Sequence, residues 1–415
     1  MSGEDTRWQD LALEVHRRLP VAAGYFEYYG YDSLFREEGA AYCDLAKLDA
    51  AHVRVFGIAL ANGGAGYFDV GPDEFLPAGD ADWAFERLLR FYDAALAETM
   101  RCPRVRVVRT VADLPVDAED PHIRVLPLVT SHTWMRDLAA VDTLFARGLR
   151  ISHCAGLICK TWNRSYPTYR VKGDQGPVLN AFGRDVIAHM NELGMILDVA
   201  HMSDESTEAI LDVSVKPIVD GHTGSRTVIP HGRGHADSTL RKIAEKGGVA
   251  GIHFADHLFC PRVWGVKYHP AVPEAPNPIR AWNQYLLDST KDPDERMRLR
   301  KDRAAQERFY REHNVTPPPP ASEERMATIS DMADHVEHLV NVMGIDHVAL
   351  GGDVNGITAH SWPAGCDHVG ELPALSAELL GRGWPEADLG KFLSENWLRV
   401  WRECLPPAGG GLCRG

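Results

Sequence analysis

GMILDVAHMSDESTEAILDVSVKPIVDGHTGSRTVIPHGR, residues 194–233, is the stretch that decides the fold. Its two short apolar runs, 195–200 and 217–219, each lead to a histidine, His201 and His222. Between them Ser203 can cap a helix with an acidic first turn. Strand, helix and strand in this order predict a βαβ unit with parallel strands. The two histidines then lie at neighbouring strand ends, where they either share a metal ion or only make loop hydrogen bonds.

The rest of the chain repeats this alternation. Helical spacing of apolar residues recurs in six segments: 83–100, 136–148, 178–194, 203–214, 238–248 and 328–344. Eight apolar runs are expected strands: 19–29, 52–62, 123–129, 149–154, 195–200, 216–221, 249–254 and 347–353. Eight strands that alternate with helices predict a single (β/α)8 TIM barrel rather than a doubly wound open sheet.

We expect one barrel domain over residues 1–402. Residues 256–326 break the alternation with charged helical runs and the sequence TPPPPA, which predicts a helical, proline-rich insertion after the seventh strand. This insertion is expected to be a lid or an interface. Residues 403–415 are expected to form a flexible tail.

Composition narrows the function classes. The formal net charge of −14 argues against nucleic acid or an anionic membrane as a partner. No apolar run is long enough to span a bilayer, and the first residues lack the pattern of a signal peptide. The eight cysteines include no CxxC pair, which favours reduced thiols and a cytoplasmic location.

Four motifs carry a resemblance to a known family. They are LGMILDVAHMS, KPIVDGHTGS, an arginine eleven residues after His222 (Arg233), and GIDHVALGGDVNG. Together they closely resemble the membrane (renal) dipeptidase family, peptidase family M19. ENWLRVW at 395–401 and GLR at 148–150 with Trp162 are similar as well. The resemblance spans about residues 20–402 and implies a (β/α)8 barrel that cleaves dipeptides with two bridged zinc ions, often as a homodimer.

The resemblance also implies roles for four residues. His201 and His222 correspond to the histidines on one zinc. Asp353 corresponds to the carboxylate that binds the other zinc and takes a proton from the nucleophilic water. Arg233 corresponds to the arginine that holds the substrate's carboxylate. This chemistry is reasonable, because a metal activates water near neutral pH and a guanidinium matches a carboxylate.

Other positions depart from the family pattern. In the first strand Tyr25 replaces a zinc-binding histidine and Glu27 replaces an aspartate. Val129 stands where the family has a bridging glutamate, and Gly156 where it has a histidine that polarises the scissile carbonyl. His153 is three residues from Gly156 and substitutes only if the loop shifts.

These losses change the expected metal content. A bridging carboxylate neutralises two cations roughly 3.5–4 Å apart, so without it we do not expect two ions. One zinc remains expected, held by His201 and His222 with Asp353 or Glu27 as the carboxylate. The alternative is an empty pocket in which these residues only make hydrogen bonds.

Several neighbouring residues are further candidates. His253 and His257 follow the seventh strand and face the same mouth, where His253, like His153, can contact substrate. His231 and His235 flank Arg233 and either contact an anionic ligand or lie exposed in a loop. Tyr25 either donates a hydrogen bond in the site or fills the space of a lost metal.

The predicted function is hydrolysis of a peptide or amide bond in a small peptide-like or amino-acid-like carboxylate substrate. Asp353 is the expected general base, Arg233 the substrate anchor, and Glu27 a ligand or acid. Two alternatives stay open. One is a non-hydrolytic enzyme of a specialised biosynthetic pathway that decarboxylates, eliminates or rearranges its substrate. The other is a non-catalytic binding protein that kept the fold.

Overall fold

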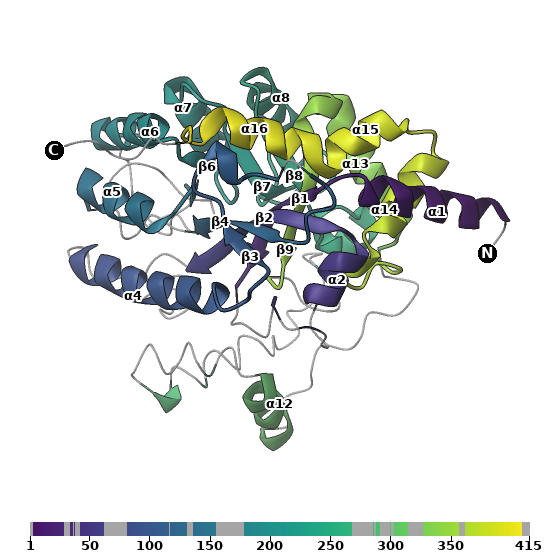
Figure 1. Cartoon of the computed structure of the whole chain (residues 1–415), viewed down its shortest axis with the longest axis horizontal. Coiled ribbons are helices and arrows are strands. Elements are labelled where there is room, and N and C mark those ends of the chain that lie inside the picture. Colours follow the sequence, from purple (N-terminus) through teal and green to yellow (C-terminus); the bar gives the residue numbers. More distant parts are fainter. Residues whose placement is uncertain are drawn as a thin grey trace.

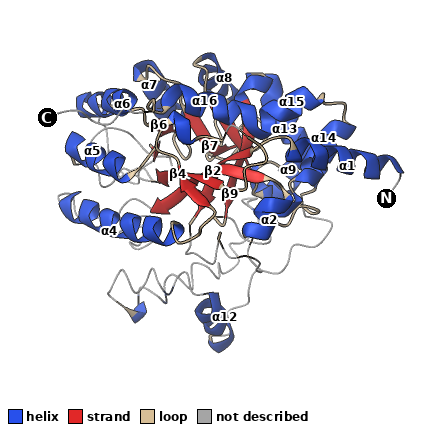
Figure 2. Cartoon of the chain, viewed as in Figure 1, coloured by secondary structure: helices blue, strands red, loops and turns tan. Residues whose placement is uncertain are grey.

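Eight parallel strands close into a barrel in the computed structural model (Figure 2). In ring order they are β1 (Val21–Glu27), β2 (Val53–Ala61), β4 (Ile123–Val129), β5 (Ile151–His153), β6 (Ile196–Asp198), β7 (Val219–Thr223), β8 (Val249–His253) and β9 (Val348–Val354). β9 pairs with β1 and closes the ring. The predicted (β/α)8 barrel is confirmed.

The structure describes residues 3–28, 34–35, 37, 42–61, 81–115, 117–130, 136–154, 178–267, 285, 288–290, 299, 303–313, 327–356 and 362–408. The glycine-rich segment near 61–66, Gly156 and Trp162 fall in the gaps between them, apart from Ala61.

Helices surround the barrel (Figure 1). The larger ones are α1 (Gly3–Arg17), α4 (Ala81–Thr99), α5 (Leu138–Arg147), α6 (Ala181–Leu193), α7 (Asp204–Val213), α8 (Asp237–Glu245), α13 (Ile329–Met343), α14 (Pro373–Gly381) and α16 (Asn396–Cys404). The short helices α2 (Leu45–Ala50) and α15 (Glu386–Gly390) complete them, and α9 (Pro261–Lys267) and α12 (Arg303–Glu312) belong to the predicted insertion. Their ends follow local chemistry: the Ser203 hydroxyl caps α7, and Gly148 ends α5 with a φ of 106°.

One short strand was not predicted. β3 (Val105–Val107) pairs with the first residues of β4, on the side that β5 occupies farther along. Three residues are too few for an alternating pattern to be recognised in the sequence. β3 lengthens the sheet locally without entering the closed ring.

The C-terminal helix α16 closes the amino-terminal end of the barrel. Its Trp397 is fully buried, and the indole Nε1 donates to the Leu350 carbonyl at 2.7 Å. A Cβ at Gly24 would lie 2.6 Å from the Trp397 ring and one at Gly251 3.0 Å, so glycines leave the space that the indole fills. The barrel therefore has room, at these strand glycines, for a tryptophan from a helix outside the ring of strands.

The described end of the chain corrects one predicted boundary. α16 continues to Cys404, and the side chains of Cys404 and Leu405 are buried in the core. The Pro406 carbonyl accepts a hydrogen bond from the Val111 amide at 3.0 Å. Residues 403–406 are packed rather than part of the tail expected from 403, because this helix covers the barrel's apolar end.

The described cysteines and helices bear on the expected reduced thiols and on the expected lack of membrane spans. Cys43, Cys102, Cys154, Cys260, Cys366 and Cys404 are buried free cysteines. Among the helices in the described ranges, we find none with the length and apolarity that a bilayer crossing needs.

Candidate active site

Histidines and carboxylates gather at the carboxyl ends of the strands. His153 ends β5 and His253 ends β8, while His222 and Asp353 lie near the ends of β7 and β9. His201 follows β6. This is the end of the barrel at which TIM-barrel enzymes carry their sites.

Two of these residues have unusual backbone conformations. His201 and Asp353 have φ values of 66° and 67°, in the left-handed region that non-glycine residues rarely adopt. Such strain costs of order 1–3 kcal/mol and concentrates at functional sites. The strand ends that carry both residues are therefore shaped for their side chains rather than for backbone stability.

Three side chains form a group that could bind a metal. Among the described residues, the ligand atoms of His222, His253 and Asp353 all lie within 4.8 Å of one another. His253 Nε2 is 3.1 Å from Asp353 Oδ2, and His253 Nδ1 accepts the Ala255 amide at 2.9 Å. His222 Nδ1 is buried and has no hydrogen-bond partner among the described residues. Two imidazoles and one carboxylate are a donor set suited to zinc, so these residues fit the metal that the sequence predicts.

The predicted ligands His201 and Glu27 are placed differently. The His201 ring packs against the group, with its centroid 5.2 Å from that of His222. Glu27 Oε1 accepts a hydrogen bond from the Tyr25 hydroxyl at 3.0 Å. Neither belongs to the three-residue group, whereas His253, which was not an expected ligand, does.

Tyr25 takes the space beside His222. The two rings stack with centroids 4.0 Å apart and planes inclined by 15°. Tyr25 is almost fully buried, so its ring both fills the barrel and fixes the plane of the His222 imidazole. Val129, at the end of β4, is fully buried and apolar, as expected where a bridging carboxylate is lost.

His153 lies against the same cluster. Its ring centroid is 5.1 Å from that of His201 and 5.8 Å from that of His222. His153 Nε2 donates to the Ala200 carbonyl, which leaves Nδ1 as a buried lone pair that no residue in the described part of the chain satisfies. Burial lowers the pKa of His153 to about 4 and holds the pKa values of His201, His222 and His253 well below normal, with Arg233 adding to the effect. These four imidazoles are therefore uncharged at pH 7.

Arg233 brings the positive charge to this site. Its Nη1 and Nη2 atoms are both buried, and neither has a hydrogen-bond partner among the described residues. The charge acts on Asp353, where burial nevertheless raises the carboxyl pKa to about 6. A buried guanidinium without an acceptor is costly, and a bound carboxylate would satisfy it.

The remaining predicted histidines have other surroundings. His235 is 1% exposed and lies between two carboxylates, so the exposed-loop alternative is wrong for this residue. The half-buried His231 ring meets the edge of Trp264 of α9, with centroids 5.0 Å apart. Burial lowers the pKa of His231 to about 4. His257 Nδ1 lies 3.3 Å from Asp256 Oδ1.

Buried aspartates beneath the site were not predicted. Asp198 Oδ1 accepts the amides of Ala200 and Gly221, both at 2.9 Å. Burial, reinforced by the neighbouring Asp220, raises the pKa of Asp198 to about 7. An aspartate inside each apolar run, in LDVAH and IVDGH, is the signal that could have identified this pair.

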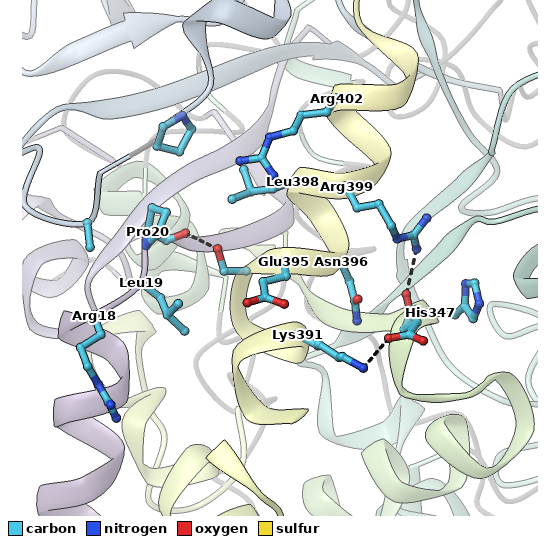
Figure 3. A pocket seen from close by; sticks show the side chains of 14 residues that line it. Arg18, Leu19, Pro20, His347, Lys391, Glu395, Asn396, Leu398, Arg399 and Arg402 are labelled. Carbon is cyan, nitrogen blue, oxygen red and sulfur yellow. Dashed lines mark hydrogen bonds and ion pairs between the residues drawn. The ribbon is translucent and has the colours of Figure 1, made fainter. Parts of the chain in front are cut away.

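A recess of about 770 Å³ lies at the other end of the barrel (Figure 3). It is lined by Pro20 before β1, His347 before β9 and the charged residues of α16 and the turn before it. Lys391 pairs with Asp346 at 2.7 Å, and Arg399 donates to the carbonyls of Gly247 and Asp346. These contacts join the C-terminal helix to the barrel, far from the histidine cluster.

Comparisons with known proteins agree with this geometry. The family model for membrane dipeptidase, peptidase family M19, matches residues 10–405. The dipeptidase tcpJ of Claviceps purpurea (strain 20.1) is 26% identical over 225 residues, which is 54% of this chain and 38% of tcpJ. The chain spans less than two thirds of the curated relatives it matches.

Two solved structures share the fold. The probable dipeptidase PvdM of Pseudomonas aeruginosa superposes with a TM-score of 0.71 at 21% identity, over 96% of this chain and 99% of that one. A metallopeptidase of Rhodobacter sphaeroides, liganded with a phosphinate mimic of the dipeptide L-Ala-D-Ala, gives 0.65 at 20% identity, over 93% and 99%. Because the family model covers nearly the whole chain, the protein belongs to the membrane dipeptidase family, peptidase family M19.

Proposed function

We propose that this protein hydrolyses the peptide bond of a small dipeptide-like substrate that carries a free carboxylate. The observation that carries this proposal is the Arg233 guanidinium near His222, His253 and Asp353, whose buried Nη1 and Nη2 atoms make no hydrogen bond to a described residue. An unpaired buried charge costs several kcal/mol, which a substrate carboxylate would offset with two parallel hydrogen bonds. The relatives' names favour hydrolysis over the non-hydrolytic and non-catalytic alternatives.

The site would hold one zinc ion, with His222, His253 and Asp353 as ligands. Binding through His253 Nε2 moves the ring proton to Nδ1 and breaks its contact with the Ala255 amide. That loss costs about 0.5–1.5 kcal/mol, whereas structural zinc sites bind with roughly 10–16 kcal/mol. When bound, such a metal polarises a carbonyl and makes water a better nucleophile near neutral pH.

The chain's own residues would then divide the remaining work. Arg233 fixes the substrate's carboxylate and so sets the position of the scissile bond. Asp353 would accept the proton from the attacking water, because its carboxylate belongs to the group that would hold the metal and its water. Tyr25 holds the plane of His222 through their stacked rings.

Hydrolysis of a dipeptide panel by the purified protein tests this proposal. L-Ala-D-Ala and similar dipeptides should be cleaved, a chelator should abolish cleavage, and added zinc should restore it. A matched substrate with an amidated C-terminus should be cleaved poorly, because Arg233 then has no carboxylate to bind. Failure to cleave any free dipeptide at saturating zinc would refute the proposed reaction, and chelator-resistant cleavage would refute the metal.

A further inference from the structure

We propose that His235 is a positioning residue that holds Arg233 in place for the substrate's carboxylate. The proposal rests on the proposed function and concerns the loop 224–236, which links β7 to α8. His235 acts from the base of this loop through two carboxylates, the partly buried Asp204 and the fully buried Asp220. We call His235, Asp204 and Asp220 the loop clamp.

The backbone first closes the loop upon itself. Ser225 and His235 form an isolated bridge between its two ends. The Arg226 amide donates to the His235 carbonyl at 2.8 Å, and the His235 amide donates to the Gly224 carbonyl at 3.0 Å. A Cβ at Gly234 would lie 2.5 Å from the Gly224 oxygen, so the two ends touch too closely for a side chain. The residues between these two ends, which include Arg233, therefore form a loop that begins and ends at this bridge.

The loop clamp then ties this base to the barrel. His235 Nδ1 hydrogen-bonds with Asp204 Oδ1 at 2.9 Å. His235 Nε2 lies 3.1 Å from Asp220 Oδ2, which is within ion-pair distance but without hydrogen-bond geometry. Asp204 belongs to the first turn of α7 and also accepts from the Ala236 amide and from Arg226. Asp220 is a fully buried residue of β7, two positions before His222. One imidazole thus connects a helix, a barrel strand and the loop.

The position of Arg233 depends on this arrangement, because it makes few other hydrogen bonds to the described residues. Its amide donates to His231 Nδ1 at 3.2 Å, within the loop itself. Its Nη1 and Nη2 atoms make no hydrogen bond to any described residue. The position of the guanidinium is therefore set by the loop backbone, which the clamp fixes two residues away. A loop ordered before binding lowers the entropy that the ligand must overcome.

The test is binding of the phosphinate mimic of L-Ala-D-Ala, measured by titration calorimetry on the zinc-loaded protein. His235→Ala should weaken binding by about tenfold or more, and Arg233→Ala by about 100-fold. If His235 acts through Arg233, the double variant should bind no more weakly than Arg233→Ala alone. In turnover, His235→Ala should raise KM more than it lowers kcat, and His235→Gln should restore part of the affinity.

Lys242→Ala is the matched control. Lys242 of α8 pairs with Glu208 of α7 at 2.7 Å, so it also ties a neighbouring element to α7, but from outside the loop. This variant should bind like the wild type. Wild-type affinity in His235→Ala, or effects of His235→Ala and Arg233→Ala that simply multiply in the double variant, would overturn the proposal.

A substrate-independent measurement separates this proposal from the proposed function. Trypsin cleaves after arginine in mobile segments, so cleavage at Arg233–Gly234 should be slow in the wild type and at least several-fold faster in His235→Ala. Mass spectrometry identifies the fragment. If the wild type does not bind the mimic, the proposed function fails, while an unchanged cleavage rate in His235→Ala refutes the clamp itself.

Discussion

The Nε2 atom of His253 lies 3.1 Å from Oδ2 of Asp353, across the junction of two neighbouring strands. β8 and β9 are in register such that His253 pairs with Gly352, so the aspartate is one residue farther along. The positive φ of Asp353 accompanies this contact. The proposed base Asp353 and the His253 imidazole thus come from adjacent strand ends, and His222 from the preceding strand completes the group.

Asp353→Asn should remove the proposed general base and also weaken the proposed zinc site, because Asp353 belongs to the group that would hold the metal. We expect kcat to fall about 100- to 10,000-fold, the range typical for loss of a positioned base. Steady-state kinetics on a cleaved dipeptide measures the change, and thermal unfolding checks that the barrel is intact. A kcat within threefold of the wild type would show that proton transfer occurs elsewhere.

Tyr25 should act mainly through its ring. Tyr25→Phe keeps the stack on His222 and removes the hydrogen bond to Glu27, so kcat should fall less than about tenfold. Tyr25→Ala removes a buried ring and should lower the free energy of unfolding by about 3–5 kcal/mol. Denaturant unfolding and kinetics on both variants separate the two roles. A Phe variant as inactive as the Ala variant would instead assign the hydroxyl to catalysis.

Arg233→Lys should not replace the arginine. A lysine keeps the positive charge but cannot make two parallel hydrogen bonds to a carboxylate. We expect KM for a free dipeptide to rise about tenfold or more, with little change for the C-amidated dipeptide. Equal losses on both substrates would place Arg233 at the scissile bond rather than at the carboxylate.

Acid should destabilise the fold through His16, which is distant in sequence from the site. Burial lowers the pKa of His16 to about 4, and its ring bonds to the Ala51 carbonyl and the Ser376 hydroxyl. The unfolded chain binds this proton more readily, so stability is complete above pH 6.5 and falls as the pH drops toward 4. Between pH 7 and pH 5 the free energy of unfolding should therefore fall by about 2 kcal/mol less in His16→Gln than in the wild type, as measured by urea unfolding. Parallel pH profiles of the two proteins would contradict this.

Most of the barrel could be predicted because its elements are long or strongly marked. The strand at 123–129 matches β4 to the residue, and Gly148 and Gly194 end helices where the sequence expects them. β3 has only three residues, and the packing of the Trp397 indole in the barrel depends on glycines from separate strands. Such long-range packing has no local signal.

The sequence predicted which residues lie at the strand ends, but it predicted less well which of them meet across neighbouring strands. His222, Asp353 and Arg233 follow motifs that fix their place in the βα repeat. The grouping of His253 with His222 and Asp353 depends on the register between β8 and β9, which a single sequence does not encode locally. The contacts of His235 with Asp204 and Asp220 likewise arise only when α7, β7 and the loop pack together.

Metal content is the most direct test of the central claim that His222, His253 and Asp353 form a metal site. Elemental analysis of protein purified without chelator should find about one zinc per chain in the wild type. His222→Ala should lose it, whereas the control His231→Ala, at a residue outside the three-residue group, should retain it. No metal in the wild type after incubation with zinc, or full occupancy in His222→Ala, would contradict the account.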